Sequence, residues 1–218
     1  MKHICKKMLA LMLALVTTLS LSGCSLFVQF DAAGYTKAVL DAATKAEFDK
    51  YIELTNSTAE DAQAEYDEVL ESFLAEFESF PLSDELLEKY KQLFIDLLAK
   101  TKYSVGEAEK DGDSFIVPLT IEPLIIYDGF DEEVEEASNA FYEELQAEVD
   151  ASGEVPSEDE IYERSYQLVY DILVARIASA TYGEPQTMTV TVSQNSDGLW
   201  SISDSDYEAI VSLLVESK

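Results

Sequence analysis

Residues 84–127 read DELLEKYKQLFIDLLAKTKYSVGEAEKDGDSFIVPLTIEPLIIY, and this stretch decides the fold. Its first half repeats apolar side chains every three or four residues, which is the period of an amphipathic helix. Its second half alternates apolar and polar residues on either side of a turn at 111–113, which is typical of an antiparallel hairpin. Pro118 and Pro123 interrupt the second run and predict an edge strand or a bulge. A helix followed directly by a hairpin predicts an α+β fold.

Two more helices are expected before this stretch. Residues 35–54 show near-helical apolar spacing, with a break around Thr44. The pattern Ser57-x-x-Glu60 has the form of a capping box, which predicts the start of a second helix. Pro81 then ends that helix. The chain therefore begins with helices and changes to strands only at the quoted hairpin.

Two helices, a closing hairpin and a last helix are expected after it. Residues 130–151 are strongly acidic with a narrow apolar stripe, which predicts a helix on the surface of the domain. A second capping box, Ser157-x-x-Glu160, opens the next helix. The fold class is therefore α+β, with N-terminal helices packed on a curved antiparallel sheet, a helical insertion at 130–181 and a C-terminal helix.

Residues 1–23 have the layout of a secretory signal, with three lysines followed by an apolar run too short to span a bilayer permanently. The segment ends in Leu21-Ser22-Gly23-Cys24, which resembles the lipobox of bacterial lipoproteins. The resemblance implies cleavage before Cys24 and a lipid on that cysteine, whose acyl chains, palmitate among them, hold the protein on the outer face of the cell membrane. The alternative is an ordinary cleaved signal that happens to precede a cysteine.

The mature chain is expected to comprise a tether at 24–33 and a single α+β domain at 34–218. Cys5 is lost with the signal and Cys24 is consumed by the lipid, so the exported domain has neither a thiol nor a disulfide. Its stability must therefore rest on its core.

The charge balance is strongly acidic, with 44 acidic against 14 basic residues and a formal net charge of −30. Without a basic patch to displace counterions, nucleic acid is excluded as a partner. Cationic peptides and divalent cations are attracted in principle, although the solubility of a surface protein explains the acids more simply.

The chain lacks the residues that most catalytic and metal sites require. Its one histidine, His3, lies in the signal, so the mature protein has no Ser-His-Asp set and no histidine ligand for zinc. The segment 193–198 has partial calcium-loop spacing, but a hairpin turn explains it better. The glutamates at 132–136 are better explained as a solvated helix face than as a cation site. We therefore expect no enzyme activity, no metal and no cofactor.

A family resemblance accompanies these patterns. Helices followed by hairpins, the last ending in Gly198-x-Trp200-x-Ile202, resemble the nuclear-transport-factor-2-like, or cystatin-like cone, domains. The phrase at 46–52 also resembles the first helices of a family of uncharacterised lipoproteins of Gram-positive bacteria that carry such a domain. The resemblance covers residues 35–203 and implies a cone with a cavity. No catalytic residue carries over from it.

Four residues of the helix after Ser157 form the candidate ligand site. Arg176 falls near the middle of the helix's apolar face, where a guanidinium needs an anionic partner. That partner is either the carboxylate of a ligand in the cavity or an acidic residue of the protein, unless the side chain reaches solvent near the helix end. Tyr162, Tyr166 and Tyr170 recur every four residues and suit either a pocket wall or the boundary of the core.

These observations predict an extracytoplasmic, membrane-anchored and non-catalytic module. It would bind a small apolar or carboxylate-bearing ligand, or dock an envelope protein. The alternative is a cone-fold enzyme that uses carboxylate and tyrosine acid-base chemistry. A cluster of pocket carboxyl groups with strongly raised pKa values would favour that alternative.

Overall fold

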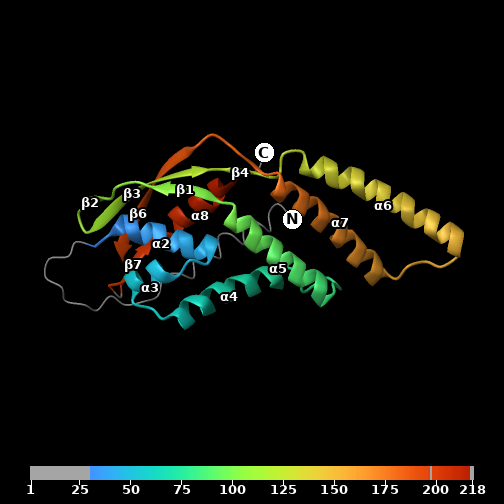
Figure 1. The fold of residues 1–218 in the computed structure, drawn as a ribbon, viewed down its shortest axis with the longest axis horizontal. Helices are drawn as coiled ribbons and strands as arrows, with labels where there is room; N and C mark the ends of the chain where they lie inside the picture. Colours follow the sequence, from blue (N-terminus) through green and yellow to red (C-terminus); the bar gives the residue numbers. More distant parts are fainter. Residues whose placement is uncertain (1–29, 197, 217–218) are drawn as a thin grey trace.

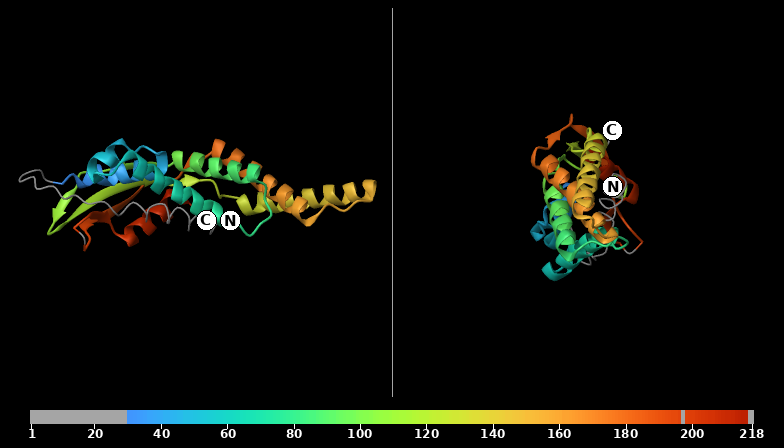
Figure 2. Two further views of the ribbon diagram at one scale, coloured as in Figure 1. Left: turned by 90° about the horizontal axis from the view of Figure 1, so that it is seen from below. Right: turned by 90° about the vertical axis from the view of Figure 1, so that its right-hand side faces the viewer.

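The computed structural model describes residues 30–196 and 198–216, which form an elongated molecule (Figure 1). Helices on a curled sheet form one end, and a two-helix hairpin projects from it, as the two views of Figure 2 also show. The signal segment, Cys24 and most of the tether lie outside the described residues, as does Asp197. Within the described ranges, no helix is both long and apolar enough to cross a membrane.

The described residues form helices and strands in mixed order. The helices are α2 (Ala32–Lys45), α3 (Asp49–Thr55), α4 (Ala59–Ala75), α5 (Asp84–Ala99), α6 (Phe130–Ser152), α7 (Glu158–Ala178) and α8 (Asp204–Leu214). The strands are β1 (Lys102–Val105), β2 (Glu109–Asp111), β3 (Ser114–Glu122), β4 (Leu124–Ile125), β5 (Thr181–Tyr182), β6 (Gln186–Gln194), β7 (Trp200–Ile202) and β8 (Val215–Glu216).

The main sheet is antiparallel throughout, with the order β1-β3-β6-β7 and with β2 also paired to β3. Alternate residues of β3 are fully or almost fully buried, as the period of two in its sequence predicts. Helices α2 and α8 pack across this sheet. The expected α+β class, with helices on a curved antiparallel sheet, is confirmed.

Pro118 corrects one part of the strand prediction, because β3 lies inside the sheet and not at its edge. On one side Pro118 pairs with Thr189 of β6. On the other side β1 ends at Val105 and β2 begins only at Glu109, so residues 106–108 bulge opposite the proline. Within this bulge the Gly106 N–H donates to the Pro118 carbonyl oxygen at 2.8 Å. The missing N–H of proline therefore breaks no ladder hydrogen bond.

Local signals placed most helix ends within a few residues. The Ser157/Glu160 capping box is present, whereas the box predicted at Ser57 is wrong by one residue, because Thr58 and Asp61 form it. The side chain of Asp61 can return to the backbone N–H of Thr58, and this reciprocal pair closes the helix start. The break expected near Thr44 falls slightly later, at 46–48.

A second, smaller sheet was not predicted. It has the order β5-β4-β8, and its β4–β8 pair is parallel. It brings the C-terminal strand beside the short strand that precedes α6. This pairing joins segments about ninety residues apart, which local sequence patterns do not reveal.

The molecule has two regions. The arm comprises residues 130–178, which hold α6, α7 and the turn between them, and the body comprises the other described residues. One cluster of buried side chains runs through the body and reaches the root of the arm, where it includes Phe130, Leu173 and Ile177. Further out along the arm, Phe141 and Leu145 are buried outside that cluster.

Candidate functional site: an apolar cleft at the root of the arm

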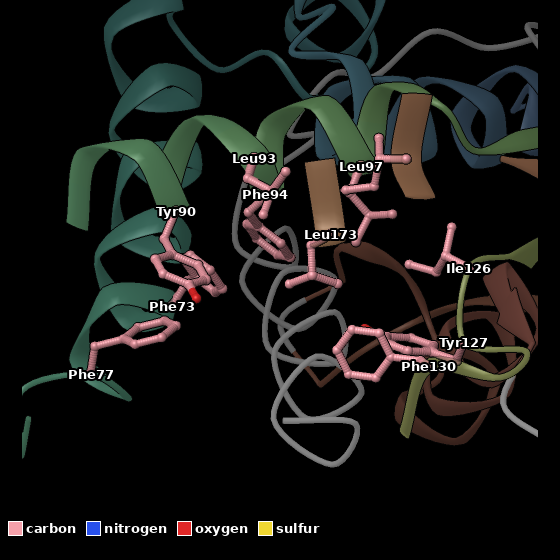
Figure 3. A pocket seen from close by; sticks show the side chains of 11 residues that line it. Phe73, Phe77, Tyr90, Leu93, Phe94, Leu97, Ile126, Tyr127, Phe130 and Leu173 are labelled. Atoms are coloured by element: carbon pink, nitrogen blue, oxygen red, sulfur yellow. The ribbon is translucent and has the colours of Figure 1, made fainter. Parts of the chain in front are cut away.

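A hollow lined by apolar side chains lies where α4, α5 and α7 meet the start of α6 (Figure 3). We call it the apolar cleft. Its lining residues are Phe73, Phe77, Tyr90, Leu93, Phe94, Leu97, Ile126, Tyr127, Phe130, Leu173 and Ile177. Its cavity volume is about 40 Å³, which suits a narrow apolar group better than a bulky ring system.

Helical spacing places two walls of the apolar cleft. Phe73 and Phe77 are four residues apart and so face the same way from α4 and the turn after it. On α5, Tyr90, Phe94 and Leu97 share one face for the same reason. Figure 3 shows these side chains converging from the two segments.

Aromatic contacts hold these walls together. Phe73 stacks on Phe94 with ring centroids 4.3 Å apart, and Phe77 lies 4.9 Å from Tyr90. Opposite them, Tyr127 and Phe130 meet edge to face at 5.6 Å. Such pairs add about 0.5–1.5 kcal/mol each beyond their area burial, so the aromatic walls are well fixed.

The cleft offers almost no polar chemistry. Its only polar side-chain atoms are the hydroxyls of Tyr90 and Tyr127, and no lining residue carries a charge. The Tyr90 hydroxyl already donates to the carbonyl oxygen of Tyr166 at 2.7 Å. An occupant would therefore be recognised through its apolar surface.

Arg176 fixes the third wall. Its Nη1 donates to the carbonyl oxygens of Ile126 at 2.9 Å and Asp128 at 2.7 Å, and its Nε donates to Glu133 Oε2 at 2.6 Å. Gly129, the N-cap of α6, adopts φ +67° beside this guanidinium, a left-handed conformation that favours glycine. The internal ion pair expected as an alternative for Arg176 is thus present, and ligand binding by Arg176 stays a prediction.

None of the three tyrosines of α7 lines the apolar cleft, although Tyr166 and Tyr170 border it. Tyr166 contacts the rings of Phe77 and Tyr90, and Tyr170 meets Tyr90 edge to face at 5.6 Å. Burial raises the pKa of Tyr166, which keeps its hydroxyl neutral. Tyr162 lies further out, beside Phe80, and is exposed.

Two polar clusters lie elsewhere in the body. Asp41 accepts hydrogen bonds from Lys37, Lys45 and Tyr103, and the Tyr103 Oη donates at 2.7 Å. Burial raises the pKa of the Glu65 carboxyl, which accepts a hydrogen bond from Tyr51 at 3.1 Å. Neither carboxyl lines the apolar cleft. The described part of the chain contains no group of three or more acidic, His or Cys side chains arranged to hold a metal.

Sequence reasoning identified α5 as core but missed the apolar cleft. The available signal was the concentration of aromatic residues on facing positions of two successive helices, at Phe73, Phe77, Tyr90 and Phe94. The third wall gave no local signal. Its residues Ile126 and Tyr127 directly follow β4, a short strand whose partner strands lie far away in sequence.

Comparisons with known proteins show the fold and no family. No family model matches the chain, and no curated protein matches it. One solved structure with a similar fold is described as "a putative lipoprotein (ycdA) from Bacillus subtilis subsp. subtilis str. 168". The match has a TM-score of 0.54 at 15% sequence identity and covers 86% of this chain and 56% of that protein's chain.

Proposed function

We propose that this chain is a lipid-anchored extracytoplasmic lipoprotein whose domain binds an apolar group without catalysing a reaction. The apolar cleft is the observation that carries this proposal. Burial of apolar surface in it would stabilise a complex by roughly 25 cal/mol per Å². Nothing in its lining would recognise a charged substrate.

The anchor is supported by the lipobox-like sequence before Cys24 and by the description of the Bacillus subtilis neighbour as a lipoprotein. A lipid on Cys24 would place the domain on the outer face of the cell membrane. A curled antiparallel sheet, with α2 and α8 across it, also supports the assignment to the nuclear-transport-factor-2-like cones.

The non-catalytic part of the proposal is supported by the side chains that the exported domain carries. It has no histidine and no cysteine beyond Cys24. The pKa of the Glu65 carboxyl is raised, but Glu65 does not line the cleft. This carboxyl would therefore not lie beside a molecule bound there. General acid-base catalysis needs such a group within hydrogen-bond reach of the substrate.

Native mass spectrometry of the exported chain, with Cys24 replaced to remove the lipid, tests the binding. We expect a bound apolar molecule that survives purification without refolding. Leu173→Trp fills the cleft and should abolish the adduct, whereas Val174→Trp adds the same ring at an exposed neighbouring position and should retain it. A clean apo mass for the parent chain, or equal adducts in both variants, would refute binding in the cleft.

The anchor has a separate test. Cells fed an alkyne analogue of palmitate should label the protein, and Cys24→Ala should abolish labelling and release the chain from the membrane fraction. An unlabelled parent chain, or a Cys24→Ala chain that stays on the membrane, would contradict the anchor but not the cleft.

A further inference from the structure

The arm gathers the exposed apolar side chains of the molecule. Four large apolar residues of the described chain are exposed, and all four lie in the arm: Tyr142, Val155, Tyr162 and Val174. Tyr142 has 62% of its surface exposed in the middle of α6, and its ring lies 5.8 Å from that of buried Phe141. Exposed aromatic residues are enriched at protein interfaces.

Helix α6 packs mainly on α7, which leaves its opposite side without a partner. Helical periodicity places Glu132, Glu135, Asn139, Tyr142, Glu143 and Gln146 in one strip that runs from that side round to one flank of the helix, and all six are exposed. We call these six residues the outer face of α6. These six residues run from position 132 to position 146 of the helix, which makes this face about 21 Å in length.

The arm also concentrates negative charge. Residues 130–178 hold fifteen acidic and two basic residues. Both bases are used inside the arm, since Arg164 pairs with Glu148 at 2.9 Å and Arg176 pairs with Glu133 at 2.6 Å. Within the described residues, Glu135 and Glu143 of the outer face form no ion pair.

We propose that the outer face of α6 docks a lysine- and arginine-rich segment of another protein. A guanidinium from that segment would lie over the ring of Tyr142, where cation–π contact favours it. Neighbouring cations would pair with Glu135 and Glu143. This site is distinct from the apolar cleft and does not depend on what the cleft binds.

Charge decides between this partner and the other surfaces available to a membrane-tethered protein. A second copy of the chain would bring two strongly acidic faces together, and an anionic membrane would repel the arm. A basic protein segment is attracted to it over about a Debye length of 8 Å at physiological salt.

Site-specific crosslinking in intact cells tests the docking. A photoreactive benzoylphenylalanine replaces Tyr142 in the full-length lipidated chain, and a second chain carries it at Gln63, an exposed position of α4. We expect one protein adduct from position 142 and none from position 63, with the crosslinked peptide of the partner rich in lysine and arginine. An adduct to a neutral or acidic segment, to a lipid or to another copy of this chain, or no adduct at all, would overturn the proposal.

A defined probe separates local docking from general attraction. The probe is a fluorescein-labelled twelve-residue peptide of alternating arginine and alanine, titrated at physiological salt. Glu135→Gln with Glu143→Gln should weaken binding about tenfold, whereas Glu71→Gln with Glu76→Gln, exposed positions in and just beyond α4, should change it less than about twofold. Tyr142→Ser keeps the charge and should weaken binding about threefold. Equal losses from the two double variants would show unlocalised attraction and overturn the proposal.

Discussion

Helix α5 of the body buries six side chains along 16 residues, whereas α6 of the arm buries three along 23. One of those three, Phe130, belongs to the root of the arm, so the outer part of α6 relies on Phe141 and Leu145. Each fully buried large apolar side chain contributes about 1.5–3 kcal/mol. The body is therefore held by its core, while the arm keeps most of its surface available to other molecules.

This difference assigns separate roles to the two regions. The apolar cleft opens where they meet, so its walls come from α4 and α5 on one side and from the base of the arm on the other. The acidic outer face lies beyond, on the part of α6 that the body does not cover. Stability and recognition are thus carried largely by different residues and can be changed separately.

The largest expected effect comes from truncating one leucine in each region. Leu98 has no exposed surface in the body core and Leu145 lies in the thin core of the arm. Leu98→Ala should lower the free energy of unfolding by about 3 kcal/mol, and Leu145→Ala by about 1 kcal/mol. Urea unfolding followed by far-ultraviolet circular dichroism, which reports the helices of both regions, measures both.

Hydrogen exchange completes this test. Leu145→Ala should speed exchange within 134–165 and leave the main sheet protected, because local openings follow local burial. If Leu145→Ala destabilises the whole protein as much as Leu98→Ala, the arm and the body form one cooperative unit and the comparison fails.

Arg176→Met tests the joint between the two regions. The variant loses the pair with Glu133 and the hydrogen bonds to the carbonyls of Ile126 and Asp128, and the Ile126 carbonyl stays partly buried without that partner. We expect local protection at 126–134 to fall by about 2 kcal/mol. Arg164→Met removes an exposed pair with Glu148 and a cation–π contact with the ring of Phe141, and should cost about 1 kcal/mol or less. Similar effects of the two variants would argue against a fixed third wall.

The Asp41 cluster gives the body a dependence on acid. Burial raises the pKa of this carboxyl, but hydrogen bonds from Lys37, Lys45 and Tyr103 more than offset that, so its pKa lies below the ordinary value. A group with a lowered folded-state pKa stabilises the fold above its unfolded pKa of about 4, and this contribution is lost as the pH falls through the folded value.

Asp41→Asn should therefore remove part of the loss of stability below pH 4 and cost about 1–2 kcal/mol at pH 7. Thermal unfolding measured at intervals between pH 2 and 7 checks both effects. Glu143→Gln is the matched control, because it also removes one carboxylate but lies in the arm, away from the Asp41 cluster. Parallel profiles for the parent chain and Asp41→Asn would contradict the assignment.

What could be predicted from the sequence was local in origin. The periodicity of α5, the hairpin turn and the Ser157/Glu160 capping box each depend on neighbours within a few residues, and the structure confirms them. The apolar cleft and the hydrogen bonds of Arg176 to residues 126–133 depend on β4, which pairs with strands far away in sequence. Of the two alternatives predicted from Pro118, the edge strand was wrong, whereas a bulge is present and lies between β1 and β2, opposite the proline.

The smallest expected effect concerns a buried hydroxyl group in the core of the body. The hydroxyl of Tyr207 is buried and has no hydrogen-bond partner among the described residues, whereas the nearby Tyr35 hydroxyl donates to the Trp200 carbonyl oxygen at 2.8 Å. An unpaired buried hydroxyl costs free energy that its removal recovers. Tyr207→Phe should therefore stabilise the protein by up to about 1 kcal/mol, and Tyr35→Phe should destabilise it by about the same amount. If urea unfolding instead shows that Tyr207→Phe is less stable than the parent chain, the Tyr207 hydroxyl forms a hydrogen bond with a buried water molecule, and the prediction is wrong.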